Sequence, residues 1–278
     1  MIVRALSIAG SDPSGGAGIQ ADLKSFAAHG AYGMAAIASL TAQNTRGVRA
    51  VFSPPPEFLA EQLDAISDDI TVDAVKIGML GNAGNIAVVA RWLAANRPPS
   101  VVLDPVMVAT SGDRLLDPAA EQAIRELLPL ADVLTPNAAE LAVLVGEPTA
   151  TELDTAIAQG RRLAATTGAR VLVKGGHLSR DTATDALVEP AWDGDGDVGG
   201  AVGLLPGPRI NTRNTHGTGC SLSSAIAALR PQRATWLAAA ADAKAWLSGA
   251  LLASDQLAVG GGAGPVHHFY HLWPATPR

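Results

Sequence analysis

Residues 214–220, with the sequence Asn-Thr-His-Gly-Thr-Gly-Cys, combine residue types that can bind an anion with a group that can react. Apolar residues recur at helical spacing over 221–229, so we predict a loop that leads into a helix. Glycines permit a tight turn, and the first N–H groups of a helix lie unpaired at the positive end of its dipole. The stretch therefore favours binding of a phosphate or stabilisation of a developing negative charge.

Cys220 is the only cysteine of the chain and is predicted to stand at the start of this helix. A helix start lowers the pKa of a thiol, so we expect an accessible thiolate there. A glycine-rich helix cap, in which Cys220 packs as a small apolar residue, explains the stretch equally well. The rest of the chain must decide between these two interpretations.

A second glycine-rich loop, residues 10–18, follows a short apolar strand over 3–9 and precedes an amphipathic helix over 19–29. Its spacing matches neither the dinucleotide-binding fingerprint nor the phosphate-binding loop that ends in Gly-Lys-Ser/Thr. The loop permits close backbone approach to a ligand, and Asp22 in the first helical turn offers a hydrogen-bond acceptor. A favourable interaction of Asp22 with the helix dipole is the alternative.

Gln43 lies in a polar tip, residues 41–45, that follows a predicted buried strand over 32–40. Its amide donates and accepts hydrogen bonds together, as recognition of a heterocycle requires. Taken by itself, the tip is better explained as an exposed turn.

Three further polar residues follow predicted strands later in the chain. Asn137 and Glu140 stand three apart at a helix start, where they form either a helix cap or an outer-shell site for Mg²⁺, which prefers oxygen ligands and keeps waters. Lys174 follows a strand of valines and leucine, so its stem can be buried while the ammonium reaches a phosphate. A surface lysine is the alternative for Lys174.

Strand and helix patterns alternate along the first two thirds of the chain, which predicts an α/β fold with a mainly parallel sheet and helices on both faces. The predicted elements are helix 56–67, strand 72–77, helix 83–95, strand 100–103, helix 118–128, strand 132–134, helices 137–144 and 152–167, and strand 170–173. In such sheets ligands bind beyond the carboxyl ends of the strands. Polar or glycine-rich pieces fall at four of these ends, namely residues 76–79, 104–107, 135–137 and 174–177. We therefore expect one shared cleft.

The last third of the chain predicts a hairpin of 185–189 with 200–205 and a long helix over 234–254. The acidic loop 193–199 is not a calcium loop of the EF-hand type, because the twelfth position, Leu204, should be glutamate. Adjacent histidines at 267 and 268 diverge and chelate a metal poorly, so we interpret them as structural or cleft-edge residues. No domain boundary or internal repeat is evident.

Composition excludes several classes of function. Hydrophobic residues make up 48% of the chain and charged residues 17%, which is typical of a globular protein. The net charge is −6 and no basic run contains aromatic residues, so neither nucleic acid nor an anionic membrane is expected as a partner. The single cysteine, the absence of a signal-peptide pattern and the absence of a bilayer-length apolar run predict a cytoplasmic location.

Seven motifs, in this order, resemble those of the hydroxymethylpyrimidine/phosphomethylpyrimidine kinases of thiamine biosynthesis, which belong to the ribokinase-like superfamily. They are GSDPSGGAGIQAD (10–22), TAQNT (41–45), KIGML (76–80), LDPVM (103–107), TPNAAE (135–140), VKGGH (173–177) and NTHGTGC (214–220). The resemblance covers nearly the whole chain and extends to the tail GPVHHF at 264–269.

This resemblance implies one ribokinase-like domain over residues 1–278, a three-layer α/β/α sandwich with a mainly parallel central sheet. It implies a small-molecule kinase that transfers the ATP γ-phosphate to 4-amino-5-hydroxymethyl-2-methylpyrimidine and a second phosphate to the resulting monophosphate. Mg²⁺ and a homodimer are also implied by similarity to the family.

The same resemblance assigns roles to individual residues. Gly10, Asp22 and Gln43 would hydrogen-bond the pyrimidine, with Ala17, Met79, Val106 and Cys220 around its ring. Mg²⁺ and its waters would be held by Asp104, Asn137 and Glu140, the nucleotide phosphates by Lys174, and the transferred phosphate by Gly217, Thr218 and Gly219. Cys220 replaces the aspartate base of most sugar kinases of the superfamily, so we expect it to accept the hydroxyl proton in the first step. The second step should depend on it less, because its acceptor is already an anion.

Two alternatives remain at this stage. A pyridoxal kinase of the same superfamily would act on a similar hydroxymethyl-substituted aromatic ring. A catalytically silent pyrimidine sensor would keep the fold without the transfer, although the chain retains all the residues expected around the phosphates.

Overall fold

A single sheet of nine strands organises the described part of the computed structural model, which comprises residues 1–107, 118–176, 178, 182–190 and 200–273. The strand order is β3-β2-β1-β4-β5-β6-β7-β8-β9. Pairing is parallel from β2 through β7, whereas β3 at one edge and the β8–β9 hairpin at the other are antiparallel. Their bounds are β1 Arg4–Ser11, β2 Tyr32–Asn44, β3 Gly47–Phe52, β4 Ala74–Ile77, β5 Val101–Leu103, β6 Val133–Leu134, β7 Arg170–Val173, β8 Asp185–Val188 and β9 Val202–Leu205.

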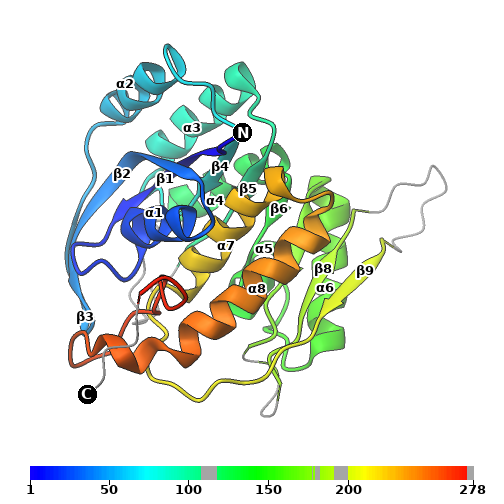
Figure 1. Ribbon diagram of the computed structural model, residues 1–278. Helices are drawn as coiled ribbons and strands as arrows, with labels where there is room; N and C mark the ends of the chain where they lie inside the picture. The colour runs from blue at the N-terminus through cyan, green and yellow to red at the C-terminus, as the bar shows by residue number, and fades with distance from the viewer. Residues whose placement is uncertain (108–117, 177, 179–181, 191–199, 274–278) are drawn as a thin grey trace.

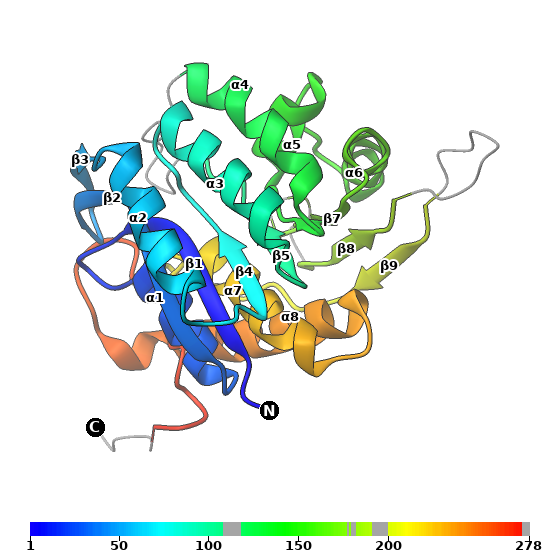
Figure 2. The ribbon, with the colours of Figure 1, turned by 90° about the horizontal axis from the view of Figure 1, so that it is seen from above.

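Helices cover both faces of this sheet, as Figure 2 shows from above. One layer contains α2 Pro56–Ser67, α3 Ala83–Asn96, α4 Pro118–Leu127, α5 Ala138–Val145 and α6 Leu153–Thr167. The other contains α1 Gly18–Ala28, α7 Thr218–Leu229 and α8 Trp236–Leu252 (Figure 1). Short 3₁₀ turns lie at Leu128–Leu130, Arg230–Gln232 and Ser254–Leu257. The three-layer α/β/α arrangement expected from the sequence is confirmed.

Two hydrophobic cores fill the spaces between the layers because neighbouring strand residues point to opposite faces. In β1, Leu6 and Ile8 join the core beneath α2–α6, while Ala5 joins the core beneath α1, α7 and α8. In β7 the same alternation places Val171 in the first of these cores and Leu172 in the second. Strands buried on both faces are apolar throughout, so their positions could be predicted from apolar runs in the sequence.

The first hairpin departs from the expected pattern. β2 continues four residues beyond the predicted end at Leu40, to Asn44, and pairs with β3, which the sequence did not indicate. The turn is closed by the Asn44 side chain, whose Oδ1 accepts the Arg46 N–H at 2.9 Å. Because most of β3 is exposed, its sequence carries no core alternation. The polar tip at 41–45 is therefore part of a two-stranded ribbon rather than a simple turn.

The second hairpin agrees with the prediction, since β8 and β9 pair antiparallel, and the acidic loop 193–199 lies outside the described residues. The long helix begins two residues later than expected because Thr235 caps it, its side chain accepting the N–H of Ala238. No helix in the described ranges has the length and apolar character needed to cross a membrane.

Candidate active site

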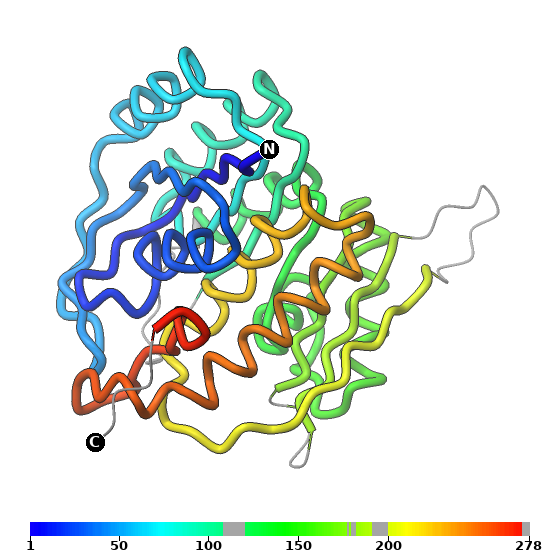
Figure 3. The backbone as a smooth tube through the Cα atoms, in the orientation of Figure 1, coloured from blue at the N-terminus to red at the C-terminus, as the bar shows by residue number. Residues whose placement is uncertain are grey.

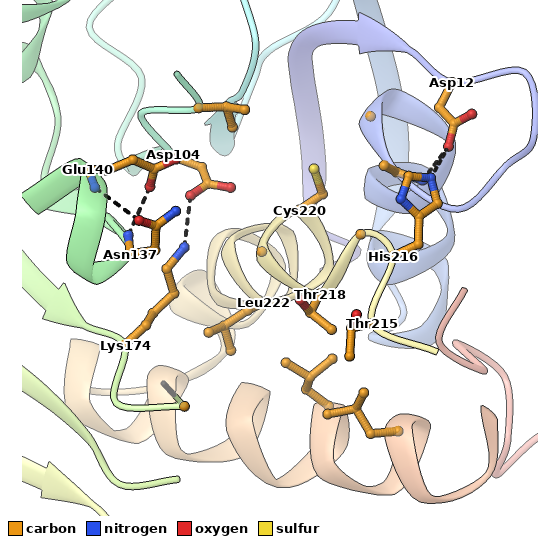
Figure 4. A pocket seen from close by; sticks show the side chains of 18 of the residues that line it. Asp12, Asp104, Asn137, Glu140, Lys174, Thr215, His216, Thr218, Cys220 and Leu222 are labelled. Atoms are coloured by element: carbon orange, nitrogen blue, oxygen red, sulfur yellow. Dashed lines mark hydrogen bonds and ion pairs between the residues drawn. The ribbon is translucent and has the colours of Figure 1, made fainter. Parts of the chain in front are cut away.

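A cavity of about 650 Å³ lies beyond the carboxyl ends of the parallel strands, between them and the helices α7 and α8. All the residues predicted for the site line it except Asp22, namely Gly10, Ala17, Gln43, Met79, Asp104, Val106, Asn137, Glu140, Lys174, Gly217, Thr218, Gly219 and Cys220. Figure 4 shows two polar groups in this cavity, Asp104 with Asn137, Glu140 and Lys174 on one side and Asp12 with His216 on the other. Cys220 lies between them.

The start of α7 offers unpaired backbone donors to this cavity. Gly217 precedes the helix with φ 76° and ψ 14°, a left-handed conformation that suits glycine. A side chain there would also overlap the carbonyl oxygen of Gly16. Across the described ranges, the N–H groups of Gly219 and Cys220 have no hydrogen-bond acceptor. An anion is the natural partner of such a helix start.

The surroundings of Cys220 reverse one expectation from the sequence. Burial raises the pKa of its thiol to about 11, and the charges of Asp22 and Asp104 raise it further, while Lys76 and the Gly18 N–H oppose them. The predicted low-pKa thiolate is therefore wrong for the ligand-free protein. The helix start is present, but desolvation and two carboxylates outweigh it.

Asp22 is not a ligand-facing residue, which corrects a second expectation. Its side chain is fully buried, and Lys76 donates to Oδ1 at 2.8 Å and to Oδ2 at 2.9 Å. The hydroxyls of Ser7 and Ser224 also donate to it, at 2.6 and 2.7 Å. With both oxygens engaged inside the protein, Asp22 anchors the Lys76 ammonium, and Lys76 is the member of the pair that lines the cavity.

A hydrogen bond that the sequence did not indicate joins the two glycine-rich loops. His216 Nε2 lies 2.7 Å from Asp12 Oδ2, and the same carboxylate accepts N–H groups of Gly16 and Ala17. Burial opposes ionisation of Asp12, but the bonds from His216 and Ser14 lower its pKa to about 2. The pair thus fixes the loop that carries Ala17 against the loop that leads into α7.

Gln43 faces this same side of the cavity. Its Nε2 lies 3.5 Å from His216 Nε2, and its Oε1 accepts from the Thr41 hydroxyl at 3.2 Å. Met79 closes the opposite wall, where its Cε would lie 2.5 Å from a Cβ at Gly10. A side chain at Gly10 would displace the Met79 methyl group, so the two residues together shape a slot beside the Gln43 amide.

Asn137 and Glu140 form a capping box at the start of α5. Asn137 Oδ1 accepts the Glu140 N–H at 2.9 Å, and Glu140 Oε2 accepts the Asn137 N–H at 2.8 Å. Burial raises the pKa of Glu140 to about 7, with Asp104 adding to the rise and Lys174 opposing it. The cap interpretation from the sequence is confirmed, and both residues still line the cavity.

Lys174 is held in the cavity rather than on the surface. Its side chain is only 18% exposed, and its Nζ lies 3.3 Å from Asp104 Oδ1, which also accepts from the Thr135 hydroxyl at 2.9 Å. Burial alone would lower the pKa of Lys174, but the charges of Asp104 and Glu140 raise it. The ammonium is therefore charged and aimed at the start of α7.

The family model for phosphomethylpyrimidine kinase matches residues 12–267. The chain belongs to the phosphomethylpyrimidine kinase family.

Three relatives place the chain within this kinase family more closely. It is 52% identical to the thiamine biosynthesis multifunctional protein of Corynebacterium efficiens over 266 residues, covering 96% of the chain but only 35% of that protein, about a third of its length. It is 48% identical to the hydroxymethylpyrimidine/phosphomethylpyrimidine kinase of Salmonella typhimurium, covering 98% and 99% of the two chains. The ADP complex of Bacillus subtilis pyridoxal kinase matches with a TM-score of 0.85 at 35% identity, covering 98% and 99%. The ribokinase-like fold expected from the sequence is confirmed.

A second, largely apolar half of the cleft could not be predicted from the sequence. It lies between the loop before α7 and the later turns of α8, and is lined by Ile210, Thr212, Leu222, Leu247, Ser248 and Leu251. Spacing on α8 indicated only a packing face. Nothing in the sequence distinguishes an apolar side chain that faces a cavity from one that faces the core.

Lys244 on α8 was also missed. Its Nζ donates to Asp185 Oδ2 at 2.6 Å and to the Ala183 carbonyl, while Asp185 Oδ1 accepts the Gly175 N–H at 2.8 Å. This chain of contacts fixes the backbone directly after Lys174. Asp185 and Lys244 carry opposite charges, but they lie 59 residues apart, so the sequence alone does not indicate that they form a pair.

Proposed function

We propose that the chain is an ATP-dependent kinase that phosphorylates 4-amino-5-hydroxymethyl-2-methylpyrimidine and then its monophosphate, to give the pyrophosphate used in thiamine biosynthesis. The observation that carries the proposal is the unpaired start of α7, which lies in one cavity with Lys174 and Asp104. A phosphoryl group bound there would meet backbone donors on one side and a fixed ammonium on the other.

The pyrimidine would occupy the slot beside Gln43. An amide side chain matches a ring that carries both a donor amine and acceptor nitrogens. Gly10 and Ala17 allow close approach of the ring, and Met79 and Val106 supply apolar contact, with Cys220 nearest the phosphate side. Asp22 would act indirectly, through Lys76.

ATP would place its base in the apolar half of the cleft between α7 and α8, and its phosphates towards Lys174. The side chains of Asp104, Asn137 and Glu140 are oxygen donors, which fit Mg²⁺, and the charge of Asp104 beside buried Glu140 favours a cation. No cluster of three His, Cys, Asp or Glu side chains suited to a metal occurs among the described residues, so the fit rests on two carboxylates and an amide. Bound Mg²⁺ would neutralise charge on the transferring phosphate.

In the first step the hydroxyl oxygen would attack the γ-phosphorus, the bond to the ADP oxygen would break, and the hydroxyl proton would leave. Cys220 is the nearest candidate to accept that proton. With a pKa of about 11, only about one thiol in 10⁴ is ionised at pH 7. The thiolate must therefore form within the complex, and the second step, whose acceptor is anionic, needs it less.

The experiment that tests this function offers Mg²⁺-ATP and three acceptors in parallel, with products resolved by mass. The acceptors are the pyrimidine alcohol, its monophosphate and pyridoxal. We expect pyrimidine monophosphate followed by the pyrophosphate, and a Cys220→Ala variant that loses the first step far more than the second. Equal loss of both steps, with binding intact, contradicts the role of Cys220.

Pyridoxal kinase activity is the second candidate, favoured by the close match to the Bacillus subtilis pyridoxal kinase complex. Pyridoxal phosphate as the sole product would establish it. No product from any acceptor would instead support a pyrimidine sensor.

We also propose that residues 1–278 form one kinase unit that acts in the cytoplasm as a homodimer, with neither nucleic acid nor membrane as a partner. The net charge of −6 supports the last point. The edge strand β3 and its neighbour expose apolar side chains, with Leu40 42%, Val51 48% and Phe52 63% exposed. A second copy could cover this ribbon. We expect sedimentation to give a dimer and Phe52→Glu to give a monomer, whereas a dimeric Phe52→Glu variant would exclude this face.

A further inference from the structure

The C-terminal segment 264–270 returns to the start of α7, where it contacts the loop that carries the anion site (Figure 3). The His216 N–H donates to the Gly264 carbonyl at 3.0 Å, and residues 216 and 265 form a parallel bridge. Val266, His267 and His268 are buried in this contact. Of the two interpretations that the sequence left open for the adjacent histidines, structural or cleft-edge, the structure supports the first, because neither residue lines the cavity.

His268 connects this segment to the first turn of α7 through Ser221. His268 Nε2 lies 2.9 Å from Ser221 Oγ, and the Ser221 hydroxyl donates to the Gly217 carbonyl at 2.8 Å. The Ser221 N–H donates to the same carbonyl at 2.8 Å. These two bonds from Ser221 hold the Gly217 carbonyl in place.

His268 is neutral at physiological pH and shares one hydrogen bond with Ser221. Burial lowers the pKa of its ring to about 3, and the charges of Lys24 and His267 lower it further, while a hydrogen bond to the Val266 backbone opposes them. The direction of the bond between His268 Nε2 and Ser221 Oγ depends on which ring nitrogen carries the proton. In either tautomer the contact fixes the position of the Ser221 hydroxyl.

His268 is itself held rigidly. The Trp246 indole N–H donates to the His268 carbonyl at 3.3 Å, and the two rings lie 5.9 Å apart. The His267 N–H donates to the Ala250 carbonyl, which ties the segment to α8. A side chain held against α8 therefore acts on the first turn of α7.

We propose that His268 is a positioning residue for phosphoryl transfer, which holds Ser221 and the Gly217 carbonyl so that the unpaired N–H groups of Gly219 and Cys220 face the transferred phosphate. This role rests on the proposed kinase function. His268 touches neither substrate nor phosphate, so its effect should fall on the rate of transfer more than on acceptor binding. Displacement of such donors by a fraction of an ångström is expected to slow transfer about 10- to 100-fold.

Three variants test the proposal in steady-state assays. His268→Leu removes the hydrogen bond to Ser221 and keeps an apolar side chain of similar size, whereas His268→Gln keeps an amide at similar reach that can donate or accept. His267→Leu is the matched control, because that ring packs against Trp273, 5.2 Å away, rather than against α7. We expect His268→Leu to lower kcat about 10- to 100-fold with KM for the acceptor within about threefold, His268→Gln to recover most of it, and His267→Leu to stay near wild type.

A double variant and a substrate-free measurement complete the test. If His268 acts through Ser221, then Ser221→Ala combined with His268→Leu should be no slower than the slower single variant. Amide exchange at residues 217–221 should be faster in His268→Leu than in His267→Leu. Equal kcat in the two leucine variants, failure of His268→Gln to recover activity, or unchanged exchange overturns the proposal. A wild type that phosphorylates no acceptor refutes the proposed function instead, and the exchange result still decides whether His268 positions this turn.

Discussion

At the scale of single residues, the electrostatics of the cleft depend on charged side chains that come from different helices, strands and loops. Cys220 stands at a helix start, which favours a thiolate, yet Asp22 from α1 and Asp104 after β5 act on the same sulfur together with Lys76 from β4. Burial and the two carboxylates together raise the pKa of the Cys220 thiol more than the Lys76 ammonium lowers it. The free protein therefore holds a neutral thiol beside the place where a phosphate would bind.

The raised pKa of Cys220 predicts slow alkylation at neutral pH. Because only the thiolate reacts, the rate with iodoacetamide should rise about tenfold per pH unit from about pH 7.5 to 10 without reaching a plateau. Cys220 is the only thiol, so total labelling measured by mass reports on it directly, with Cys220→Ala as the blank. If the alkylation rate reached a plateau below about pH 8, Cys220 would have a low pKa, as the sequence predicted.

Residue types could be predicted from the sequence more readily than their partners. Gln43, Lys174 and Asn137 line the cavity as expected, because each lies at or just beyond the carboxyl end of a strand. The partner of Asp22 could not be predicted, because Lys76 lies 54 residues away on another strand. The Asp12–His216 contact spans 204 residues and was missed for the same reason.

At the scale of elements, the turn before α7 depends on Gly217, and we predict that Gly217→Ala abolishes transfer. Alanine would meet both the strain of a left-handed φ of 76° and an overlap with the Gly16 carbonyl. Gly146, at the end of α5, has a similar φ of 72°, and no atom lies within 4 Å of the position that a Cβ would take there, so Gly146→Ala isolates the strain alone. We expect kcat to fall at least about 100-fold in Gly217→Ala and to stay within about twofold in Gly146→Ala.

The stability and activity of these two glycine variants can also contradict a special role for the turn before α7. Backbone strain at a left-handed position costs about 1–2 kcal/mol, so Gly146→Ala should lose about that much stability in urea unfolding and Gly217→Ala should lose more because of the overlap. Equal loss of activity in the two would mean that the turn before α7 has no special role in transfer.

The start of α5 combines a structural and a chemical role that one substitution can separate. Serine caps helices as well as asparagine does, so Asn137→Ser should keep the stability of the protein within about 0.5 kcal/mol. It removes the amide oxygen from the cavity. If that oxygen helps to hold Mg²⁺ or its waters, the Mg²⁺ concentration for half-maximal rate should rise about three- to tenfold.

Asn137→Ala provides the control for the cap at this position. It should lose about 1 kcal/mol of unfolding free energy by urea titration in addition to the change in Mg²⁺ dependence. An unchanged Mg²⁺ requirement in both variants would leave Asn137 as a cap alone.

Elements buried on both faces were the most predictable, and those outside the core the least. The strands from β1 to β7 read as apolar runs and were expected, apart from β3 and from small shifts at the strand ends. β3 was not expected, because its residues are largely exposed and its place is set by the turn at 44–47. The same limit applies to the tail, where only the fold shows that His268 reaches Ser221.

At the scale of the whole molecule, a parallel sheet brings distant motifs to one edge. The carboxyl ends of β1, β4, β5, β6 and β7 deliver Gly10, Met79, Asp104, Asn137 and Lys174 to the same cavity, and α7 closes it. This convergence follows from topology and was predictable. The apolar half between α7 and α8 was not, because it depends on how two helices of one layer lie relative to each other.

Packing of the C-terminal segment and α1 also makes the stability of the molecule depend on pH. Burial is the main cause that lowers the pKa of His29 to about 4 and that of His268 to about 3, both below the 6.5 of an unfolded chain. Between these values the unfolded state binds protons that the folded state does not. The contribution of these histidines to stability is therefore complete above about pH 6.5 and is lost as the pH falls below it.

Replacement of His268 by glutamine should remove its share of this acid sensitivity while keeping a side chain that can hydrogen-bond Ser221. At about pH 5 one such histidine costs about 2 kcal/mol of unfolding free energy relative to about pH 7.5. Glu140, whose pKa is raised, acts in the opposite direction, so the difference between wild type and variant is the informative quantity. In urea unfolding over this pH range, the wild type should lose about 2 kcal/mol more than His268→Gln, and parallel losses would mean that His268 is protonated in the folded protein.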